Sequence, residues 1–294
     1  MLYRFHQVMS LCTYGISALL ALILLNACTE PIGTVSPTPH TIPTLFPTLD
    51  IPSDIPETDP PSDLVVPDTG WIAGSNSVES RRIQVDLGAD LLSGSITVVR
   101  FDPTIVRMRV AYDADNPRLL SEWFNETNPL IAVNGGFFTE EYRSTALVIS
   151  DGAISGQSYE NFGGMLAVAS DGTVSIRSLS QQPYNPDESL VQAMQSFPML
   201  IQPGGIPTDV DNIDRAQRTV VAQDRNGRIM FVVSPDRLFT LSGMAQWLSE
   251  SDLEIDSALN LDGGSSTGII VNADAAQEQI EALGRLPLIL LVES

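Results

Sequence analysis

Apolar and polar residues alternate along much of the chain after residue 80. Residues 80–87, 95–101 and 106–112 show this alternation and are rich in β-branched side chains. A period of two places successive side chains on opposite faces of a sheet, so these segments predict strands with one exposed face. Shorter apolar runs predict further strands at residues 130–133, 199–202, 258–261, 267–271 and 287–292.

Three glycine turns mark places where neighbouring strands reverse direction. Asp151-Gly152, Asp171-Gly172 and Asn226-Gly227 each stand between apolar stretches. Such pairs favour the tight turns of β-hairpins. Asn226-Gly227 gives the strongest of the three signals, and it predicts a hairpin between residues 218–223 and 228–233.

Other segments have the spacing of amphipathic helices, with apolar residues three or four positions apart. The predicted helices cover residues 116–126, 188–195, 240–249 and 274–283. Many short strands with interspersed helices indicate the α+β class. We therefore expect a single domain of mixed β-sheets with several packed helices.

The first 28 residues have the pattern of an export signal. Arg4 precedes a mostly apolar run that ends in Leu25-Asn26-Ala27-Cys28. This ending resembles the bacterial lipoprotein box, whose cysteine receives a lipid after cleavage, so Cys28 is the predicted lipidation site. An uncleaved transmembrane anchor is the alternative, because the run is nearly long enough to span a bilayer. Both interpretations predict an exported, membrane-anchored protein that faces outside the cytoplasm.

A proline-rich, acidic linker follows at residues 29–67. Ten of the 20 prolines lie there, and such a segment behaves as an extended, semi-rigid spacer. The remaining residues, 68–294, are enough for one domain with a substantial core.

The composition of this domain limits its chemistry. Its sequence has no histidine and no cysteine, because His6, His40, Cys12 and Cys28 all precede it, and the 15 basic residues of the chain are all arginines. Histidine-dependent triads, lysine Schiff bases and histidine-bound zinc are therefore excluded. A net charge of −21 argues against a nucleic-acid partner. Proton transfer must use Asp, Glu, Tyr or water.

Two predicted strands end in a polar residue followed by two glycines. The first is followed by Asn134-Gly135-Gly136 and the second by Asp262-Gly263-Gly264. Paired glycines allow positive φ and close approach of a ligand to backbone N–H groups. We expect Asn134 and Asp262 to face one mouth, and the alternative is two tight turns.

The ordered set of motifs resembles the phosphodiester glycosidase family from about residue 130 to residue 292. In chain order, the motifs are Asn134-Gly135-Gly136-Phe137-Phe138, Gly164-Met165-Leu166-Ala167-Val168, Ser196-Phe197-Pro198-Met199-Leu200-Ile201, Arg218-Thr219 with Asp224 and Gly227, and Ala258-Leu259-Asn260-Leu261-Asp262-Gly263-Gly264-Ser265. The resemblance implies hydrolysis of the bond between a sugar's anomeric carbon and a phosphodiester oxygen, with a sugar phosphate or glycan as substrate.

The resemblance also implies roles for single residues. Asp262 is the candidate nucleophile or base, and a turn-capping aspartate is its alternative. Arg218 is the candidate phosphate clamp, because its planar fork matches phosphate oxygens, and a structural salt bridge is its alternative. Asn134 would bind sugar hydroxyls or the phosphate. The other predicted substrate contacts are Gly135, Gly136, Thr219, Asp224, Gly263, Gly264 and Ser265.

The sequence departs from the family pattern at two places. Ser265 stands where many relatives have a third glycine, and Ala222-Gln223 precede Asp224 where some relatives have Gly-His. A hydrolase acting on envelope or exopolysaccharide glycans is the first hypothesis. A non-catalytic, glycan-binding envelope lipoprotein is the second, and a structural envelope component is the third.

Acidic residues outside the glycine loops offer weaker candidates. Asp209, Asp211, Asn212 and Asp214 could hold calcium or magnesium, but their spacing is not that of an EF-hand and a solvated loop is the alternative.

The first glycine loop is followed by further candidates. Glu140, Glu141 and Tyr142 could supply a second carboxylate at the mouth. Phe137 and Phe138 are expected in the core rather than as a sugar platform.

Overall fold

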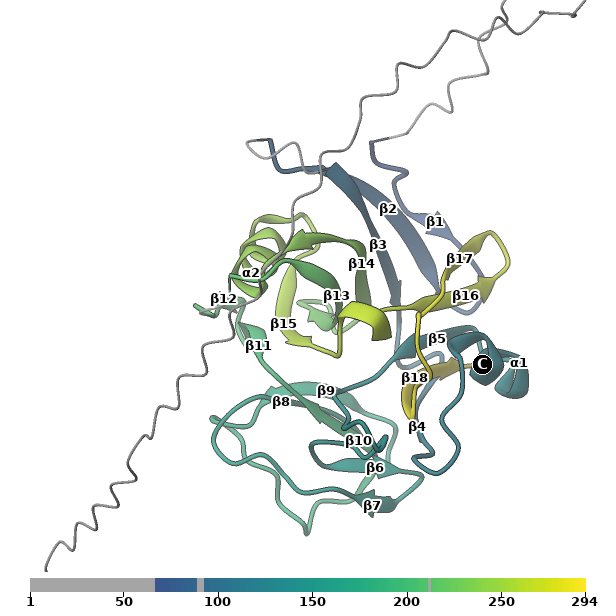
Figure 1. Cartoon of the computed structure of the whole chain (residues 1–294), viewed down its shortest axis with the longest axis vertical. Coiled ribbons are helices and arrows are strands. Elements are labelled where there is room, and N and C mark those ends of the chain that lie inside the picture. Colours follow the sequence, from purple (N-terminus) through teal and green to yellow (C-terminus); the bar gives the residue numbers. More distant parts are fainter. Residues whose placement is uncertain (1–66, 89–92, 211–212) are drawn as a thin grey trace, which may run out of the picture. The chain divides into compact units, whose positions relative to one another are not determined.

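The strands of this chain form three sheets whose members come from distant parts of the sequence (Figure 1). The computed structural model describes residues 67–88, 93–210 and 213–294, which lie in the unit Ser62–Ser294. The export signal, Cys28 and nearly all of the linker lie outside the described residues, so their assignments remain predictions.

The first and largest sheet has eight strands. In spatial order they are β1 (Ile72–Ala73), β2 (Glu79–Asp86), β3 (Ser93–Phe101), β14 (Ile229–Phe239), β13 (Ala216–Asp224), β15 (Ile255–Asn260), β11 (Met199–Gln202) and β12 (Ile206–Pro207).

The second and third sheets have five strands each. The second runs β7 (Ala153–Ser155), β6 (Val148–Ser150), β10 (Leu190–Ser196), β8 (Gly164–Ala169) and β9 (Val174–Ser178). The third runs β17 (Ala276–Ile280), β16 (Ile269–Ala273), β5 (Ile131–Asn134), β18 (Leu288–Glu293) and β4 (Arg107–Tyr112). All pairings between the described strands are antiparallel. The sheets are mixed only in the sense that neighbouring strands come from distant parts of the chain.

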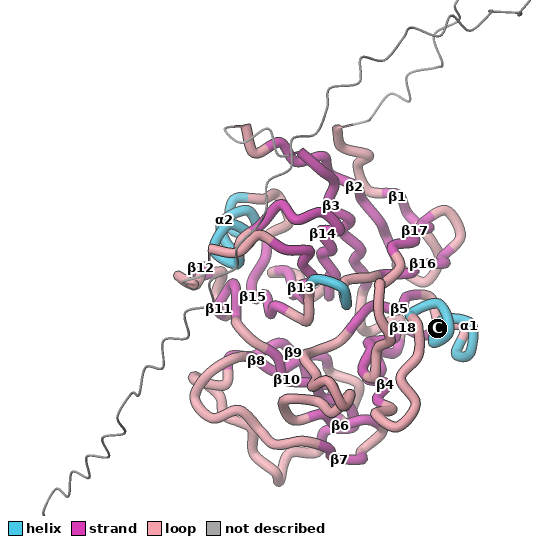
Figure 2. The backbone as a smooth tube through the Cα atoms, viewed as in Figure 1, coloured by secondary structure: helices cyan, strands magenta, loops and turns pink. Residues whose placement is uncertain are grey.

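Two α-helices of the described chain lie on opposite sides of the sheets, and a short 3-10 turn, η1 (Gly264–Ser266), lies between them (Figure 2). Helix α1 (Leu120–Thr127) packs Leu120 and Trp123 against the third sheet. Helix α2 (Leu241–Glu250) begins after Thr240, whose hydroxyl accepts a hydrogen bond from the Gly243 N–H at 2.9 Å. Its apolar face packs on the first sheet. The main core fills the space between the sheets.

The strand predictions agree with the structure, and the three glycine turns join β6 to β7, β8 to β9 and β13 to β14. The prediction of several packed helices is wrong. Residues 188–195 fall mostly in β10, which pairs with both β6 and β8, and residues 274–283 contain a turn and β17. Good helix formers occupy both segments, but pairing within a sheet outweighs their local propensity.

An N-terminal strap, residues 67–73, lies along β2. Thr69 N donates to Arg82 O at 3.0 Å, and Asp68 pairs with Arg81 at 2.5 Å. The Arg100 guanidinium lies 3.6 Å from the ring centroid of Trp71. Hydrogen bonds, an ion pair and a cation–π contact therefore fix the first described residues to the domain.

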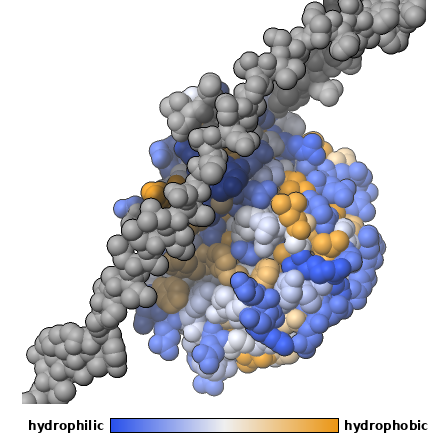
Figure 3. Space-filling view, in the orientation of Figure 1, coloured by the Kyte–Doolittle hydropathy of each residue, from blue (hydrophilic) through white to orange (hydrophobic). Residues whose placement is uncertain are grey.

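The visible surface is mostly hydrophilic, with small separate apolar groups (Figure 3). None of the helices in the described part of the chain is long and apolar enough to span a bilayer.

Candidate functional site

The two glycine loops meet where β5 of the third sheet and β15 of the first sheet end. Asp262 N, two residues after β15, donates to Gly135 O, one residue after β5, at 3.0 Å. Leu261 N donates to Thr219 O of β13 at 2.9 Å. The turn η1 follows directly and lies beside β13 in the centre of Figure 2. Loops separated by about 130 residues of sequence thus form one structure.

Asn134 fastens these loops together through its side chain. Its Nδ2 donates to Asp262 O at 2.7 Å, and its Oδ1 accepts from Thr219 Oγ1 at 2.7 Å and from Gly268 N at 3.1 Å. Asn134 and Thr219 are both fully buried. The side-chain amide of Asn134 hydrogen-bonds to protein groups and has no exposed surface. Asn134 therefore holds the two loops together from behind the site.

Glycine is required in both loops because protein backbones approach closely. A Cβ on Gly135 would lie 2.7 Å from Leu288 Cγ and 2.9 Å from Leu288 O. A Cβ on Gly263 would lie 2.6 Å from Gln217 O. These distances are shorter than non-bonded carbon and oxygen contacts allow, so a side chain at either position would clash. The two glycines are therefore explained by the packing of the protein itself, without a ligand.

Asp262 provides a half-buried carboxylate at the junction. Its Oδ1 accepts a hydrogen bond from Gly263 N at 2.9 Å. Burial raises the pKa of Asp262, while hydrogen bonds from the Ser266 hydroxyl and the Gly263 N–H act in the opposite direction. A carboxylate that is partly desolvated but still hydrogen-bonded is a stronger base than one in water.

Two buried polar atoms near Asp262 have no hydrogen-bond partner among the described residues. They are Oδ1 of Asn260 and Oγ1 of Thr267. Asn260 uses its other amide atom, Nδ2, to donate to Phe197 O at 2.9 Å. Unsatisfied buried groups cost free energy, so each of these two atoms could form a hydrogen bond with a ligand or water. Sequence reasoning missed Asn260 as well as Ser266, although a polar residue inside the apolar run Ala258-Leu259-Asn260-Leu261 was a usable signal.

Arg218 lies beside the second loop, but its guanidinium is directed elsewhere. Its Cα is 4.0 Å from the position that a Cβ of Gly263 would occupy. Its Nη2 donates to Asp214 O at 2.7 Å and its Nε to Phe239 O at 3.2 Å. Burial lowers the pKa of this guanidinium. The structure thus brings the Arg218 backbone to the site and holds the side chain on neighbouring carbonyls.

Asp224 lies at the far end of β13 from Thr219. Its carboxylate accepts hydrogen bonds from Asn226 N and Arg228 N, each at 2.9 Å, and from Arg228 Nε at 2.7 Å. Five residues of a strand span about 17 Å. The structure therefore does not bring Asp224 to Asp262, and places it in the turn of the β13–β14 hairpin.

The remaining predicted contacts divide into buried and accessible positions. Gly136 is buried, and its N–H donates to Met194 Sδ at 2.9 Å. Ser265 is exposed, and Gly263 and Gly264 are half-buried. Gly264 has a φ of 59°, which glycine adopts without strain. The accessible part of the site is therefore Asp262 with residues 263–265.

After the first loop the acidic residues are exposed, whereas the aromatic residues are half-buried and Phe138 packs against the core next to the third sheet. Glu140 and Glu141 are exposed, and the Thr139 hydroxyl lowers the pKa of Glu141. The Phe138 ring is half-buried and stacks on Tyr142 with centroids 5.9 Å apart.

The candidate metal loop is only partly described. Asp211 and Asn212 lie outside the described residues, whereas Asp209 and Asp214 lie within them. In the ranges 67–88, 93–210 and 213–294, no group of three or more His, Cys, Asp or Glu side chains gathers as a metal site.

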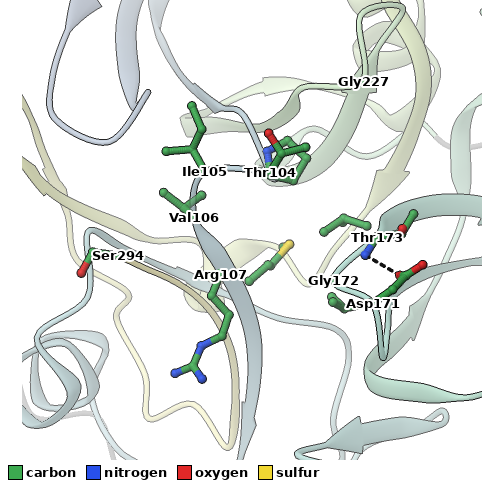
Figure 4. Close-up of a pocket in the computed structure, with 13 residues that line it drawn as sticks. Thr104, Ile105, Val106, Arg107, Asp171, Gly172, Thr173, Gly227 and Ser294 are labelled. Atoms are coloured by element: carbon green, nitrogen blue, oxygen red, sulfur yellow. Dashed lines mark hydrogen bonds between the residues drawn. The ribbon is translucent and has the colours of Figure 1, made fainter.

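A large cavity of about 630 Å³ lies at the other end of the sheets (Figure 4). It is lined by residues 103–108, the Asp171-Gly172 turn, Gly227 and Ser294. Within it, Thr173 N donates to Asp171 Oδ1 at 2.9 Å. Arg107 on its wall pairs with Glu293 in the third sheet, whereas Leu288, which contacts Gly135, pairs with Tyr112. Five strand residues separate the two ends by roughly 17 Å, so this cavity is distinct from the Asp262 site.

The geometry defines a β-rich domain in which an aspartate follows a buried strand at the junction of two glycine loops, without histidine, lysine or cysteine. The chain belongs to the phosphodiester glycosidase family: the family model matches residues 127–286, more than half of the sequence. This match confirms the resemblance seen in the ordered motifs. No curated protein matches the sequence significantly.

Solved structures share the fold. One is the catalytic domain of zebrafish N-acetylglucosamine-1-phosphodiester α-N-acetylglucosaminidase, auto-inhibited by its pro-peptide, with 19% identity, a TM-score of 0.60, and coverage of 78% of this chain and 89% of that one. Another is a protein of Synechocystis, with 16% identity, a TM-score of 0.54, and coverage of 76% and 63%. A third, from Burkholderia pseudomallei, has 14% identity, a TM-score of 0.50, and coverage of 69% and 74%.

Proposed function

We propose that this protein is a hydrolase that releases a sugar from a glycosyl-1-phosphodiester. The observation that carries the proposal is the Asp262 carboxylate, half-buried at the junction of two glycine loops and followed by the exposed Ser265. Membership of the phosphodiester glycosidase family supports the same reaction class.

The proposed reaction breaks the bond between the anomeric carbon and the bridging oxygen. Water supplies a hydroxyl group to the anomeric carbon, and the departing oxygen keeps the bonding electrons as part of a phosphomonoester. The water's second proton leaves to solvent or to the phosphate. Because a phosphate is a good leaving group, its departure needs little help from a general acid. The protein must chiefly support positive charge at the anomeric carbon and deliver water.

Asp262 is the proposed nucleophile or base. Desolvation raises the basicity of its carboxylate, and the hydrogen bonds from Gly263 and Ser266 hold its orientation. The carboxylate can attack the anomeric carbon or remove a proton from attacking water, and both routes need its ionised form.

Asn134 and Thr219 are proposed as positioning residues. Asn134 Nδ2 donates to the backbone carbonyl of Asp262, and Thr219 Oγ1 donates to Asn134 Oδ1. This buried chain of hydrogen bonds connects the third sheet to the first and fixes the backbone of the residue that carries the carboxylate. Fixed geometry reduces the reorganisation needed in the transition state.

Arg218 and the second glycine loop are proposed to bind the phosphate. The Arg218 backbone lies beside Gly263, so the guanidinium would reach a bound phosphate by exchanging carbonyl acceptors for phosphate oxygens. Exposed Ser265 and the N–H groups of residues 264 and 265 would supply further donors, whereas Gly263 N already donates to Asp262 Oδ1.

An exported, membrane-anchored setting remains part of the proposal. The apolar N-terminus and Cys28 support lipidation, and the proline-rich residues 29–67 would hold the domain away from the membrane. An envelope or exopolysaccharide glycan is the substrate that this setting favours.

Hydrolysis in water labelled with ¹⁸O tests the reaction. The substrates are methyl phosphodiesters of α-N-acetylglucosamine, α-glucose, α-galactose and α-mannose. The proposal predicts free sugar and methyl phosphate, with ¹⁸O in the sugar; label in the phosphate would show cleavage of the P–O bond and overturn it. Asp262→Asn should abolish release, while Asp256→Asn, on the same strand with a carboxylate that caps Gly204 N, serves as the matched control.

A glycan-binding protein without turnover is the second candidate. The Ser265 departure and the containment of Asn134 within the protein favour it. Binding of the same phosphodiesters without release of sugar would support this alternative against hydrolysis.

A further inference from the structure

Three aromatic side chains form a partly exposed group at one end of the second sheet. Phe162 and Phe197 have 46% and 44% of their surface exposed, and Tyr159 is half-buried. The rings of Tyr159 and Phe162 stack with centroids 4.6 Å apart and 24° between their planes. Phe197 meets Phe162 edge-on at 5.5 Å and 79°. We call these three residues the aromatic group.

The aromatic group is held firmly to its own sheet. Tyr159 N donates to Gln195 Oε1 of β10 at 2.8 Å, and Gln195 Nε2 donates to Ser158 Oγ at 2.8 Å. A Cβ on Gly163 would lie 3.2 Å from the Tyr159 ring and 3.7 Å from Phe197 Cβ, so these two side chains pack around this glycine. A rigid, exposed aromatic surface loses little entropy when a ligand covers it.

Separate contacts tie the aromatic group to each of the two glycine loops. The Tyr159 hydroxyl lies 3.0 Å from Thr145 Oγ1, and Thr145 N donates to Phe137 O, one residue after the first loop, at 3.0 Å. Asn260, two residues before Asp262, donates through Nδ2 to Phe197 O at 2.9 Å. The aromatic group therefore contacts residues that adjoin both glycine loops, through Thr145 on one side and Asn260 on the other.

We propose that the aromatic group is a sugar-binding platform on which a pyranose ring of the substrate stacks, with Phe162 as its principal contact. Ligand sites combine aromatic faces with a few fixed polar groups, and a pyranose ring has both an apolar C–H face and hydroxyls at its rim. Phe162 and Phe197 supply the apolar surface, and Asp262 with residues 263–265 supplies the polar groups. This inference rests on the proposed function for its choice of ligand.

The composition of the group favours a sugar over a protein partner. The aromatic group is linked to the strand that leads to Asp262 through the hydrogen bond from Asn260 to Phe197 O, whereas exposed apolar residues elsewhere, such as Ile105 and Ile154, stand on other elements. Three rings form a surface of the size of one or two sugar rings, far below that of a stable protein interface.

Variants of Phe162 test the platform through affinity. Phe162→Ala should raise KM for a cleaved methyl glycosyl phosphodiester about 5- to 10-fold and leave kcat within about 2-fold, because stacking acts on ground and transition states alike. Phe162→Leu keeps an apolar side chain without an aromatic face and should lose nearly as much, while Phe162→Trp should retain affinity. Ile154→Ala, an exposed apolar position on β7, is the control and should change nothing.

Titration calorimetry in an Asp262→Asn background separates this inference from the proposed function. The probes are the same four phosphodiesters, whose binding can then be measured without turnover. Weaker binding by Asp262→Asn/Phe162→Ala than by Asp262→Asn supports the platform. If the wild type cleaves none of the probes, the hydrolase proposal fails but this result still supports the platform. Unchanged KM and affinity in Phe162→Ala and Phe197→Ala, or no binding of any probe to the wild type, overturns the platform.

Discussion

At the scale of single residues, the Asp262 carboxylate experiences opposing effects. Burial favours its neutral form, while donors from Gly263 and Ser266 favour the ion, and burial is the larger effect because the pKa is raised. The fold therefore gives up some stability at neutral pH to keep a charged group at the loop junction, as active sites commonly do.

The first prediction separates stability from activity at this residue. A raised folded-state pKa gives stability that is complete below the unfolded pKa and is lost as pH rises through the folded pKa. Asp262→Asn should therefore raise Tm at pH 7 by roughly 2–4 °C for each kcal/mol recovered, and abolish release of sugar. Scanning calorimetry and the rate assay measure both, and a lower Tm at pH 7 together with full activity would contradict the assignment.

The pH profile of the wild type gives a second test at the same residue. If the working form of Asp262 is the ion, kcat/KM should fall on the acid side, with its midpoint above the usual pKa of an aspartate. An acid side that stays flat down to the usual pKa would exclude Asp262 as the essential base.

Two buried threonines provide a matched pair. Thr219 Oγ1 donates to Asn134, whereas Thr267 Oγ1 has no partner among the described residues. Thr219→Val should cost about 1–2 kcal/mol of unfolding free energy and reduce kcat, because it removes the hydrogen bond to Asn134, which in turn positions Asp262. Thr267→Val should be neutral or stabilising. Urea unfolding measures the difference, and equal effects would show that Asn134 does not depend on Thr219.

At the scale of elements, the sheets are joined by particular side chains. Glu278 of β17 has only 4% of its side chain exposed and pairs with Arg82 of β2 at 2.7 Å, which links the third sheet to the first. Removing one partner of a buried ion pair leaves a charge without compensation.

This link gives a prediction with an internal control. The Arg82 side chain is 56% exposed, so Arg82→Ala should destabilise the domain by about 1–2 kcal/mol, mainly by leaving the buried Glu278 carboxylate without its partner. Glu278→Gln should cost less because the amide still accepts a hydrogen bond. Arg107→Ala removes one of two arginines that pair with Glu293, and since the Arg107 side chain is 74% exposed it should cost about 1 kcal/mol or less. Denaturant midpoints at pH 7 decide, and equal losses in the two arginine variants would mean that the sheets do not depend on Glu278.

The same elements show what the sequence can and cannot predict. Alternation and glycine turns predicted the strands and hairpins because both signals are local. The segment that forms β10 and the segment that forms β17 contain good helix formers, and only pairing with β6, β8 and β16 makes them strands. That information lies in partners elsewhere in the chain, which a local pattern does not contain.

The site shows a similar division. The meeting of the Asn134 and Asp262 loops was predictable from strand ends followed by glycine pairs, whereas the full burial of the Asn134 side chain was not. The direction of the Arg218 side chain was not predictable, because the carbonyls of Asp214 and Phe239, to which it donates, are backbone groups whose positions only the fold determines. The aromatic group was missed because Tyr159, Phe162 and Phe197 are brought together by a loop and a strand end that lack a periodic pattern.

At the scale of the whole molecule, the described chain begins with the strap along β2. Hydrogen bonding to Arg81 lowers the pKa of Asp68 to about 2. A lowered folded-state pKa gives stability above the unfolded pKa, near 4, that is lost as pH falls toward 2. Attachment of the strap should therefore weaken between pH 4 and pH 2.

Hydrogen exchange tests the attachment of the strap. Protection of the Thr69 and Gln84 amides, which donate to Arg82 O and Pro67 O, should fall over that pH range after correction for intrinsic rates. Asp68→Asn should show low protection already at pH 5. Asp252→Asn, at a more exposed partner of Arg81, is the control and should have a smaller effect. Protection that is independent of pH would show that backbone pairing alone holds the strap.

The strap also determines how the domain would respond to a mechanical load. If residues before 67 are tethered to a membrane as proposed, a pull on the tether enters the fold through Pro67 and Asp68. The strap and β2 are antiparallel strands joined by a short turn, so the load can peel their hydrogen bonds one after another from the open end. The cation–π contact between Arg100 and Trp71 would oppose such peeling. Because the load enters the fold at the strap, we expect drag on a bound polymer to open the strap before it disturbs the loop that carries Asp262.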